Sequence, residues 1–145
     1  MGAAEMMLAY GANMHQADML QRAPRSAFLG IARLEGWRIG VSRSGWLGVE
    51  PNTDACVWGA LYQLGEGDEP RLDEYEAVGR GLYRKCRLET IGPDGRVVAL
   101  VYVPNEPLDG VVRGEYLARC IDAAAEIGLS AEWIEGLRAL ATIRR

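Results

Sequence analysis

The spacing of apolar and polar residues predicts a strand and then a short helix at the start of the chain. Residues 5–14, EMMLAYGANM, form an apolar run that we expect to be a strand through Tyr10, broken at Gly11. Residues 15–24, HQADMLQRAP, have the spacing of a short helix that Pro24 closes. The residues spaced for one side of this helix are Met14, Met19 and Leu20.

From Phe28 onward the period changes towards two, which is typical of strands. β-Branched and aromatic runs are separated by Gly, Pro and Asn clusters such as GVEPNTD at 48–54. This pattern predicts three strands in this part of the chain. They are FLGIARL at 28–34, GWRIGVS at 36–42 and DACVWGALYQL at 54–64.

Two further strand-like runs are joined by a turn. LYRKCRLETI at 82–91 and RVVALVYV at 96–103 flank the four residues GPDG at 92–95. Gly, Pro and Asp each favour turn conformations for their own steric or hydrogen-bonding reason. The sequence therefore predicts a hairpin of two antiparallel strands.

The last third of the chain has helical spacing. Residues 114–129, GEYLARCIDAAAEIGL, carry an apolar stripe, and Gly128 ends it. A second helix is expected to begin at Ser130, a good N-cap, with Glu132 in its first turn. The inward residues are Leu117, Cys120, Ile121, Ala124 and Ile127 in the first helix, and Trp133, Leu137 and Leu140 in the second.

Together these elements predict a single domain over residues 1–145, of fold class α+β. Most of the strands follow one another too closely for helical crossovers, which indicates an antiparallel or mixed sheet. We expect a small mixed or antiparallel β-barrel with flanking helices.

The charge of the chain narrows the choice of partners. Sixteen basic and twenty acidic side chains give a formal net charge of −4, without a basic block. Nucleic acid and anionic membranes are therefore poor candidates. No apolar run approaches the roughly 20 residues that span a bilayer, and no signal-type pattern precedes the first strand. We expect a cytoplasmic protein with no membrane partner.

Residues for metal or nucleophilic chemistry are few. Cys56, Cys86 and Cys120 are widely spaced without a CxxC pair, and we interpret them as small core residues. His15 is the one histidine, and we expect it at the surface or at a helix start. No Gly-x-Ser-x-Gly elbow accompanies it, which argues against a hydrolytic triad. The sequence predicts neither a metal site nor a cofactor.

One carboxylate in RLDEYEAVGRGLY, residues 71–83, is a candidate for acid-base chemistry. If this stretch is helical, Glu76 lies four residues after Leu72 and shares its apolar face. Partial burial would raise the pKa of this carboxylate towards neutral pH. On spacing alone, an exposed ion pair with Arg80, worth about 0.3–0.5 kcal/mol, is the simpler interpretation. The carboxylates expected to face solvent are Asp73 and Glu74.

The turn YGAN at 10–13, where the first strand meets a helix, is the second candidate site. Such a turn can direct backbone N–H groups at an anionic or carbonyl oxygen, and the helix N-terminus adds a partial positive charge. An ordinary strand-to-helix connection explains the same residues more simply.

Taken together and in this order, these stretches resemble the gamma-glutamylcyclotransferase family. Its members carry Tyr-Gly-Ser-Asn-Leu after a first strand, and later Leu-Asp-x-x-Glu-Gly followed by Gly-x-Tyr. The corresponding residues here are YGANM at 10–14, LDEYEA at 72–77 and GLY at 81–83. The resemblance continues through the hairpin and the C-terminal helices, and so covers nearly the whole chain.

The resemblance implies an enzyme that needs no cofactor and acts on a small-molecule gamma-glutamyl substrate. In this reaction the α-amine attacks its own γ-carbonyl, which forms 5-oxoproline and expels the attached amine. Glu76 would be the catalytic carboxylate that moves the proton between the two nitrogens. The substrate-binding residues that the resemblance implies are Met7, Leu8, Ala9, Tyr10, Gly11, Ala12, Asn13, Tyr83 and Tyr116.

Two departures from the family pattern leave the function open. Ala12 replaces a serine and removes a hydroxyl from the loop, and Ala77 replaces a glycine and adds a methyl beside the site. A non-catalytic small-molecule binding module with the same pocket is the alternative, and hydrolysis to glutamate is a third possibility. Trp46 and Trp58 could line the leaving-group side or pack in the barrel. The sequence also leaves open whether the protein is a monomer or a homodimer.

Overall fold

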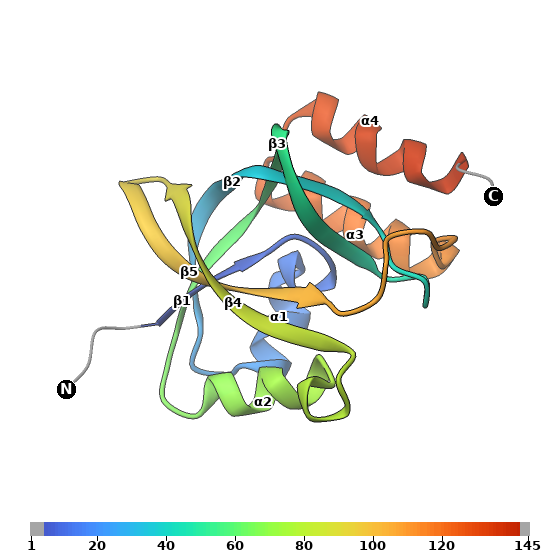
Figure 1. Cartoon of the computed structure of the whole chain (residues 1–145). Helices are drawn as coiled ribbons and strands as arrows, with labels where there is room; N and C mark the ends of the chain where they lie inside the picture. The colour runs from blue at the N-terminus through green and yellow to red at the C-terminus, as the bar shows by residue number, and fades with distance from the viewer. Residues whose placement is uncertain (1–4, 143–145) are drawn as a thin grey trace.

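Five strands close into a barrel. The computed structural model describes residues 5–142, in which the strand order around the barrel is β1-β3-β2-β4-β5 (Figure 1). β1 (Glu5–Ala9) pairs antiparallel with β3 (Leu47–Leu64) and parallel with β5 (Gly95–Pro104), so the barrel is mixed. The predicted fold class, an α+β barrel with flanking helices, is confirmed.

The predicted hairpin is also confirmed. β4 (Tyr83–Gly92) pairs antiparallel with β5 along its whole length, and Pro93 and Asp94 connect the two strands. Turn chemistry acts between neighbouring residues, and for that reason the sequence was sufficient to predict it.

The prediction of three strands between residues 28 and 64 is wrong. Two long strands, β2 (Ala27–Val41) and β3, occupy this region, and the GVEPNTD cluster lies inside β3. Their antiparallel register shifts between Glu35 and Trp37, so the ladder bends and continues. Gly36 lies at this shift with a φ of +86°, a conformation that glycine adopts at little steric cost.

Apolar side chains fill the barrel, as expected for a closed sheet of so few strands. Cys120 is buried, as predicted, whereas Cys56 and Cys86 are only half-buried. Fully buried side chains that the strands contribute are Met7, Leu8, Leu34, Leu47, Val49, Val57, Tyr62 and Leu100.

The segment after β1 forms a 3-10 turn, η1 (Ala12–Met14), and then α1 (Gln16–Arg22). His15 is the N-cap of α1, because its Nδ1 accepts a hydrogen bond of 3.2 Å from the backbone N–H of Asp18. The prediction of a helix-start role for His15 is confirmed.

The predicted apolar side of this helix is only partly correct. Met14 and Met19 are fully buried, but Leu20 is 53% exposed. Met14 belongs to η1, and the chain is extended at His15 between the two elements. Helical spacing counted from Met14 therefore does not continue into α1.

Both C-terminal helices are present as predicted. α3 (Gly114–Ile127) ends at Gly128, and the hydroxyl of Ser130 caps α4 (Ala131–Ala139) by accepting from the N–H of Trp133 at 3.0 Å. Figure 1 shows α3 and α4 together on one side of the barrel and α2 on another. The remaining elements are α2 (Asp68–Tyr75), η2 (Val78–Arg80) and η3 (Leu140–Thr142).

The predicted inward faces of these helices pack against the barrel core. Leu117, Cys120, Ala124 and Leu137 are buried. The partly buried residues that contact the same core are Ile121, Ile127, Trp133, Ile134 and Leu140. Within residues 5–142, no helix has the length and apolar character needed to cross a membrane.

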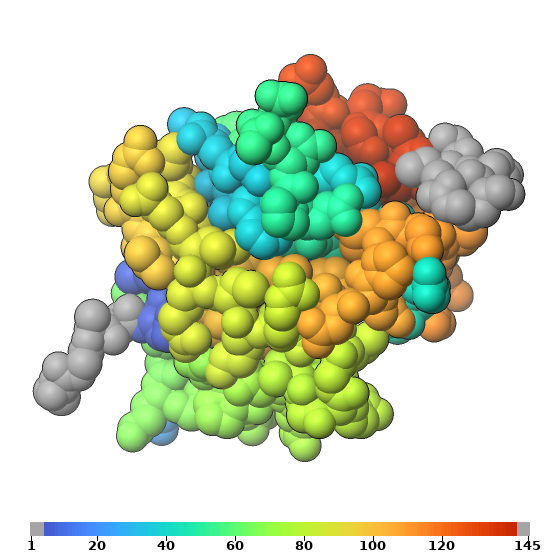
Figure 2. Space-filling model, in the orientation of Figure 1, coloured from blue at the N-terminus to red at the C-terminus, as the bar shows by residue number. Residues whose placement is uncertain are grey.

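The segment after β5 lies beside the connection between η2 and β4, as the orange and yellow-green surfaces in Figure 2 show. The backbone N–H of Asn105 donates to the carbonyl of Leu82 at 3.0 Å, and its side-chain amide donates to the carbonyl of Gly81 at 2.8 Å. These bonds hold the turn that follows α2 against the barrel.

Candidate functional site

A cavity of about 270 Å³ opens where the end of β1 faces the end of α2. The catalytic and substrate-binding residues that the family resemblance implies all line this cavity. They are Met7, Leu8, Ala9, Tyr10, Gly11, Ala12, Asn13, Glu76, Tyr83 and Tyr116. The other lining residues are Trp46, Leu47, Tyr75, Ala77, Arg80, Leu82 and Tyr102.

The turn after β1 forms one wall. The hydroxyl of Tyr10 donates to the backbone carbonyl of Tyr102 at 2.6 Å, which ties the turn to β5. Met14 N–H donates to the carbonyl of Gly11 at 3.0 Å in the first hydrogen bond of η1. The N–H groups of Ala12 and Asn13 precede that bond and take no part in the turn's own hydrogen bonds.

Gly11 allows this turn to approach α3. A Cβ atom at this position would lie 2.9 Å from the hydroxyl oxygen of Tyr116. Tyr116 lies in the first turn of α3. A Cβ atom at position 11 would therefore require the Tyr116 hydroxyl to shift.

Leu47 holds two of the cavity tyrosines through its backbone. Its N–H donates to the hydroxyl oxygen of Tyr116 at 3.1 Å, and its carbonyl accepts from the hydroxyl of Tyr83 at 2.9 Å. Trp46 packs edge-on against Tyr116, with 5.0 Å between ring centroids, and the Arg113 guanidinium lies 4.3 Å from the centroid of the Trp46 ring. This frame places both phenol groups at the cavity wall.

Of the two tryptophans considered for the leaving-group side, Trp46 lines the cavity. Trp58 instead contacts Arg33 of β2, whose guanidinium lies 5.7 Å from the centroid of its ring.

Glu76 lies at the C-terminal end of α2. Its N–H still donates to the carbonyl of Leu72 at 2.8 Å, so both side chains keep the common face that helical spacing predicted. Ala77 then turns the chain, with φ of +56° and ψ of 40°. Among the non-glycine residues of the described chain, Ala77 is the only one with a positive φ. A left-handed residue after a helix is usually glycine, which explains glycine at this position in the family motif.

Burial raises the pKa of the Glu76 carboxyl to about 7, against the opposing effects of the Arg22 charge and the Asn13 hydrogen bond. The side-chain amide of Asn13 donates to Oε2 of Glu76 at 3.1 Å. The alternative ion pair with Arg80 does not occur among the described residues. Glu76 can therefore exchange a proton near neutral pH.

The tyrosines around the cavity stay protonated at that pH. Burial raises the pKa of Tyr10, Tyr83, Tyr102 and Tyr116 above its usual value. Within the described lining, Glu76 is thus the group suited to take up and release a proton.

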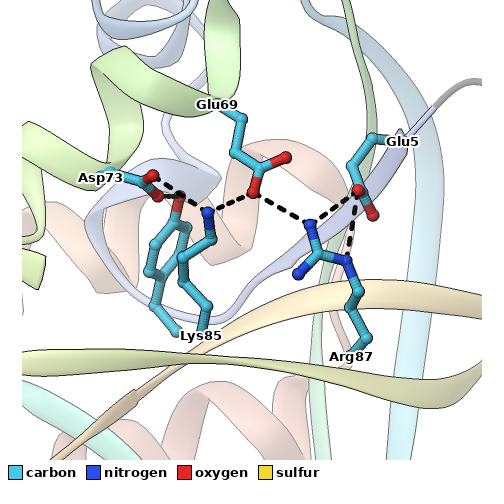
Figure 3. Close-up of polar contacts among 6 residues, drawn as sticks. Glu5, Glu69, Asp73, Lys85 and Arg87 are labelled. Atoms are coloured by element: carbon cyan, nitrogen blue, oxygen red, sulfur yellow. Dashed lines mark hydrogen bonds and ion pairs between the residues drawn. The ribbon is translucent and has the colours of Figure 1, made fainter.

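α2 is held on the barrel by a chain of ion pairs (Figure 3). Arg87 of β4 donates to Glu5 and to Glu69, each at 2.9 Å. Lys85 of β4 pairs with Glu69 and, at 3.0 Å, with Asp73. The network joins β1, β4 and α2 just before the helix reaches Glu76.

The prediction that Asp73 faces solvent is wrong. Besides pairing with Lys85, its carboxylate accepts a hydrogen bond of 2.8 Å from the hydroxyl of Tyr102, which lines the cavity. Glu74 is exposed, as predicted. Helical spacing separated Glu76 from its neighbours but carried no information about β4 and β5, which supply the partners of Asp73.

Sequence reasoning missed Tyr102, Leu47 and Arg22. Tyr102 lies in a continuous apolar run without a distinguishing pattern, and Leu47 contributes backbone atoms, so neither had a sequence signal.

Among the described residues, no group of three His, Cys, Asp or Glu side chains is arranged to hold a metal ion.

The chain is similar in sequence to known proteins. A model of the AIG2-like family matches residues 56–137. Human gamma-glutamylcyclotransferase is 24% identical over 146 residues, which cover 93% of this chain and 78% of the human protein.

Solved structures show the same fold. One named gamma-glutamyl cyclotransferase has a TM-score of 0.87 at 22% identity, over 94% of this chain and 88% of its own. An uncharacterised human protein also has a TM-score of 0.87, at 23% identity, over 95% of this chain and 88% of its own. YkqA from Bacillus subtilis has a TM-score of 0.82 at 17% identity, over 97% of this chain and 55% of its own.

Proposed function

The chain belongs to the AIG2-like family and has the gamma-glutamylcyclotransferase fold, and from this premise we propose that it converts a gamma-glutamyl compound into 5-oxoproline and a free amine. The observation that carries the proposal is the position of Glu76. This carboxylate has a pKa of about 7 and lies in a cavity that also contains the loop of the Tyr-Gly-x-Asn motif.

In the proposed reaction, Glu76 accepts a proton from the α-ammonium of the substrate. The freed amine nitrogen then forms a bond to the γ-carbonyl carbon, which closes the five-membered ring. The bond from that carbon to the leaving nitrogen breaks, and the protonated Glu76 returns its proton to the departing amine. Glu76 then carries the second proton of the ring nitrogen to the same amine, which leaves as an ammonium, so the ring nitrogen keeps the single hydrogen of 5-oxoproline. Glu76 ends in its starting state, so no external base or acid is consumed.

The remaining cavity residues would bind and orient the substrate. The N–H groups of Ala12 and Asn13, which take no part in the hydrogen bonds of η1, would bind a substrate carboxylate or carbonyl oxygen. The protonated hydroxyls of Tyr83 and Tyr116 are fixed by Leu47 and give the cavity a rigid polar wall. A rigid site favours the folded substrate conformation that ring closure requires. The serine-to-alanine difference at position 12 leaves the backbone donors in place.

Release of 5-oxoproline from a panel of gamma-glutamyl amino acids and amines, measured by mass spectrometry, tests this function. Glu76→Gln should reduce the rate by at least about a hundredfold, as expected for a general acid-base residue. Glu74→Gln is the matched control, because it removes an exposed carboxylate two residues away and should leave the rate unchanged. Retention of activity in Glu76→Gln would contradict the assigned role.

The product separates this proposal from its two alternatives. Free glutamate in place of 5-oxoproline would indicate hydrolysis. Binding of a gamma-glutamyl compound without turnover, measured by calorimetry with the wild-type protein, would support a non-catalytic binding module.

A further inference from the structure

We propose that Arg22 is a positioning residue that acts on Glu76 through the side-chain amide of Asn13. This inference rests on the proposed function in so far as Glu76 performs the proton transfers. It concerns a residue of α1 that the cavity lining does not include.

The three side chains form a directed chain of hydrogen bonds. Nη1 of Arg22 donates to Oδ1 of Asn13 at 2.7 Å, and Nδ2 of Asn13 donates to Oε2 of Glu76 at 3.1 Å. An arginine can only donate hydrogen bonds, so Arg22 can bond to the carbonyl oxygen of the amide but not to its NH₂ group. The NH₂ end must then face Glu76. Arg22 thereby determines that Asn13 presents a donor to the carboxylate.

Burial makes this orientation persistent. Asn13 is only 6% exposed, so little water is available to replace either hydrogen bond. A buried amide with one end unpaired would carry a desolvation cost of about 1–3 kcal/mol. In the reversed orientation, the NH₂ group would face the donors of Arg22, and the carbonyl oxygen would face the carboxylate of Glu76.

Arg22 is itself held from two further directions. Its guanidinium carbon lies 3.9 Å from the centroid of the Tyr75 ring, and its Nη2 lies 4.0 Å from a carboxylate oxygen of Asp18. Asp18 also pairs with Arg119 of α3, so the guanidinium is supported by α1, α2 and α3 together. The Arg22 side chain is 21% exposed, which leaves its charge only partly screened.

The charge of Arg22 favours the ionised form of Glu76. Burial acts in the opposite direction, and the neighbouring tyrosines are neutral because their own pKa values are raised. Removing the cation while keeping the carboxylate should therefore move the pKa of Glu76 upwards. The titratable or charged groups that line the cavity with Glu76 are Tyr10, Tyr75, Arg80, Tyr83, Tyr102 and Tyr116.

Three variants of Arg22 separate its charge from its shape. Arg22→Gln and Arg22→Met both remove the charge. If one of them does not fold, the other still provides the test. Arg22→Lys keeps a cation that can donate to Asn13. Arg25→Met is the matched control, because it removes the same charge from a side chain that is 67% exposed and pairs with Glu66.

The first measurement is the titration of Glu76 by NMR of side-chain carboxyl carbons, assigned by comparison with Glu76→Gln. We expect the midpoint to rise by about one pH unit in Arg22→Gln and Arg22→Met, as for a carboxylate that loses a nearby cation. Arg22→Lys should stay within about half a unit of wild type, and Arg25→Met should not shift. An unchanged midpoint in the neutral variants would overturn the inference.

The second measurement is kcat/KM for 5-oxoproline release as a function of pH. The acidic limb should move with the midpoint, so that the rate at pH 6 falls about tenfold in the neutral variants while the rate at high pH changes little. A uniform loss at all pH values would mean a purely structural role and would also overturn the inference. If wild type releases no 5-oxoproline, the proposed function fails, but the NMR titration still decides whether Arg22 acts on Glu76.

Discussion

The side-chain amide of Asn13 donates a 3.1 Å hydrogen bond to the carboxylate of Glu76, although 63 residues separate the two in the chain. Asn13 belongs to the turn after β1, and Glu76 follows α2. The bond therefore joins the two segments that carry the sequence motifs, and it does so inside the cavity.

The raised pKa of Glu76 should make folding stability depend on pH. Its carboxyl has a pKa of about 7 in the folded protein, compared with 4.5 as the ordinary value, so the folded state binds more protons between these limits. The free energy of unfolding should fall as pH rises from about 4.5 to about 7, by on the order of 2 kcal/mol. Urea unfolding of wild type and Glu76→Gln across this range measures the effect. The variant should lack this decline, and parallel curves for the two proteins would contradict the assigned pKa.

Ala77→Gly should stabilise the protein slightly or leave its stability unchanged. Glycine relieves the steric cost of about 1–2 kcal/mol that a Cβ carries in the left-handed region, but adds about 0.5–1 kcal/mol of backbone entropy to the unfolded chain. The expected gain, measured by urea unfolding, is at most about 1.5 kcal/mol. Ala77→Val should instead destabilise, because a branched side chain is strongly disfavoured at a φ of +56°. Equal stability of the glycine and valine variants would argue against this backbone conformation in solution.

Arg80 should favour substrates whose leaving group carries a carboxylate. It lines the cavity, is exposed, and makes no ion pair with any of residues 5–142. A hydrogen bond to a charged group contributes about 1.5–3 kcal/mol, which corresponds to at least about tenfold in affinity. Arg80→Gln should therefore raise KM about tenfold for a gamma-glutamyl amino acid.

The matching neutral substrate is the control for this prediction. A gamma-glutamyl alkylamide of similar size lacks the second carboxylate, and its KM should change less than about twofold in Arg80→Gln. Arg96→Gln removes an equal charge from the β4–β5 hairpin, where Arg96 pairs with Glu89, and should affect neither substrate. Equal increases in KM for both substrates would contradict this prediction. They would mean that Arg80 binds the glutamyl part that both substrates share, or that it stabilises the fold.

Lys85→Met should loosen α2 and so reduce turnover. Lys85 bridges Glu69 and Asp73, and its removal leaves two half-buried carboxylates of α2 with fewer partners. We expect a loss of about 1 kcal/mol in the free energy of unfolding, near the upper end for pairs that are partly exposed. Arg96→Met is the control, because it breaks an exposed pair and should cost less than about 0.5 kcal/mol. Similar losses in both variants would show that the network does not anchor α2.

The parts of the fold that the sequence predicted are those that neighbouring residues control. The Pro93-Asp94 turn, the end of α3 at Gly128 and the start of α4 at Ser130 depend on the backbone preferences and hydrogen bonds of residues close in the chain. Helical spacing also distinguished Glu76 from the exposed Glu74. Each of these features depends on residues that lie only a few positions apart, so it can be predicted from the amino-acid sequence.

The remaining features depend on contacts between distant segments. β3 continues through GVEPNTD because β2 pairs with it across a register shift, and Asp73 is half-buried because Lys85 and Tyr102 come from other strands. The sequence by itself determined the barrel class, the helix ends and the candidate carboxylate. Only the tertiary structure decided which groups surround that carboxylate, because burial and long-range partners, which set its pKa, exist only once the barrel has closed.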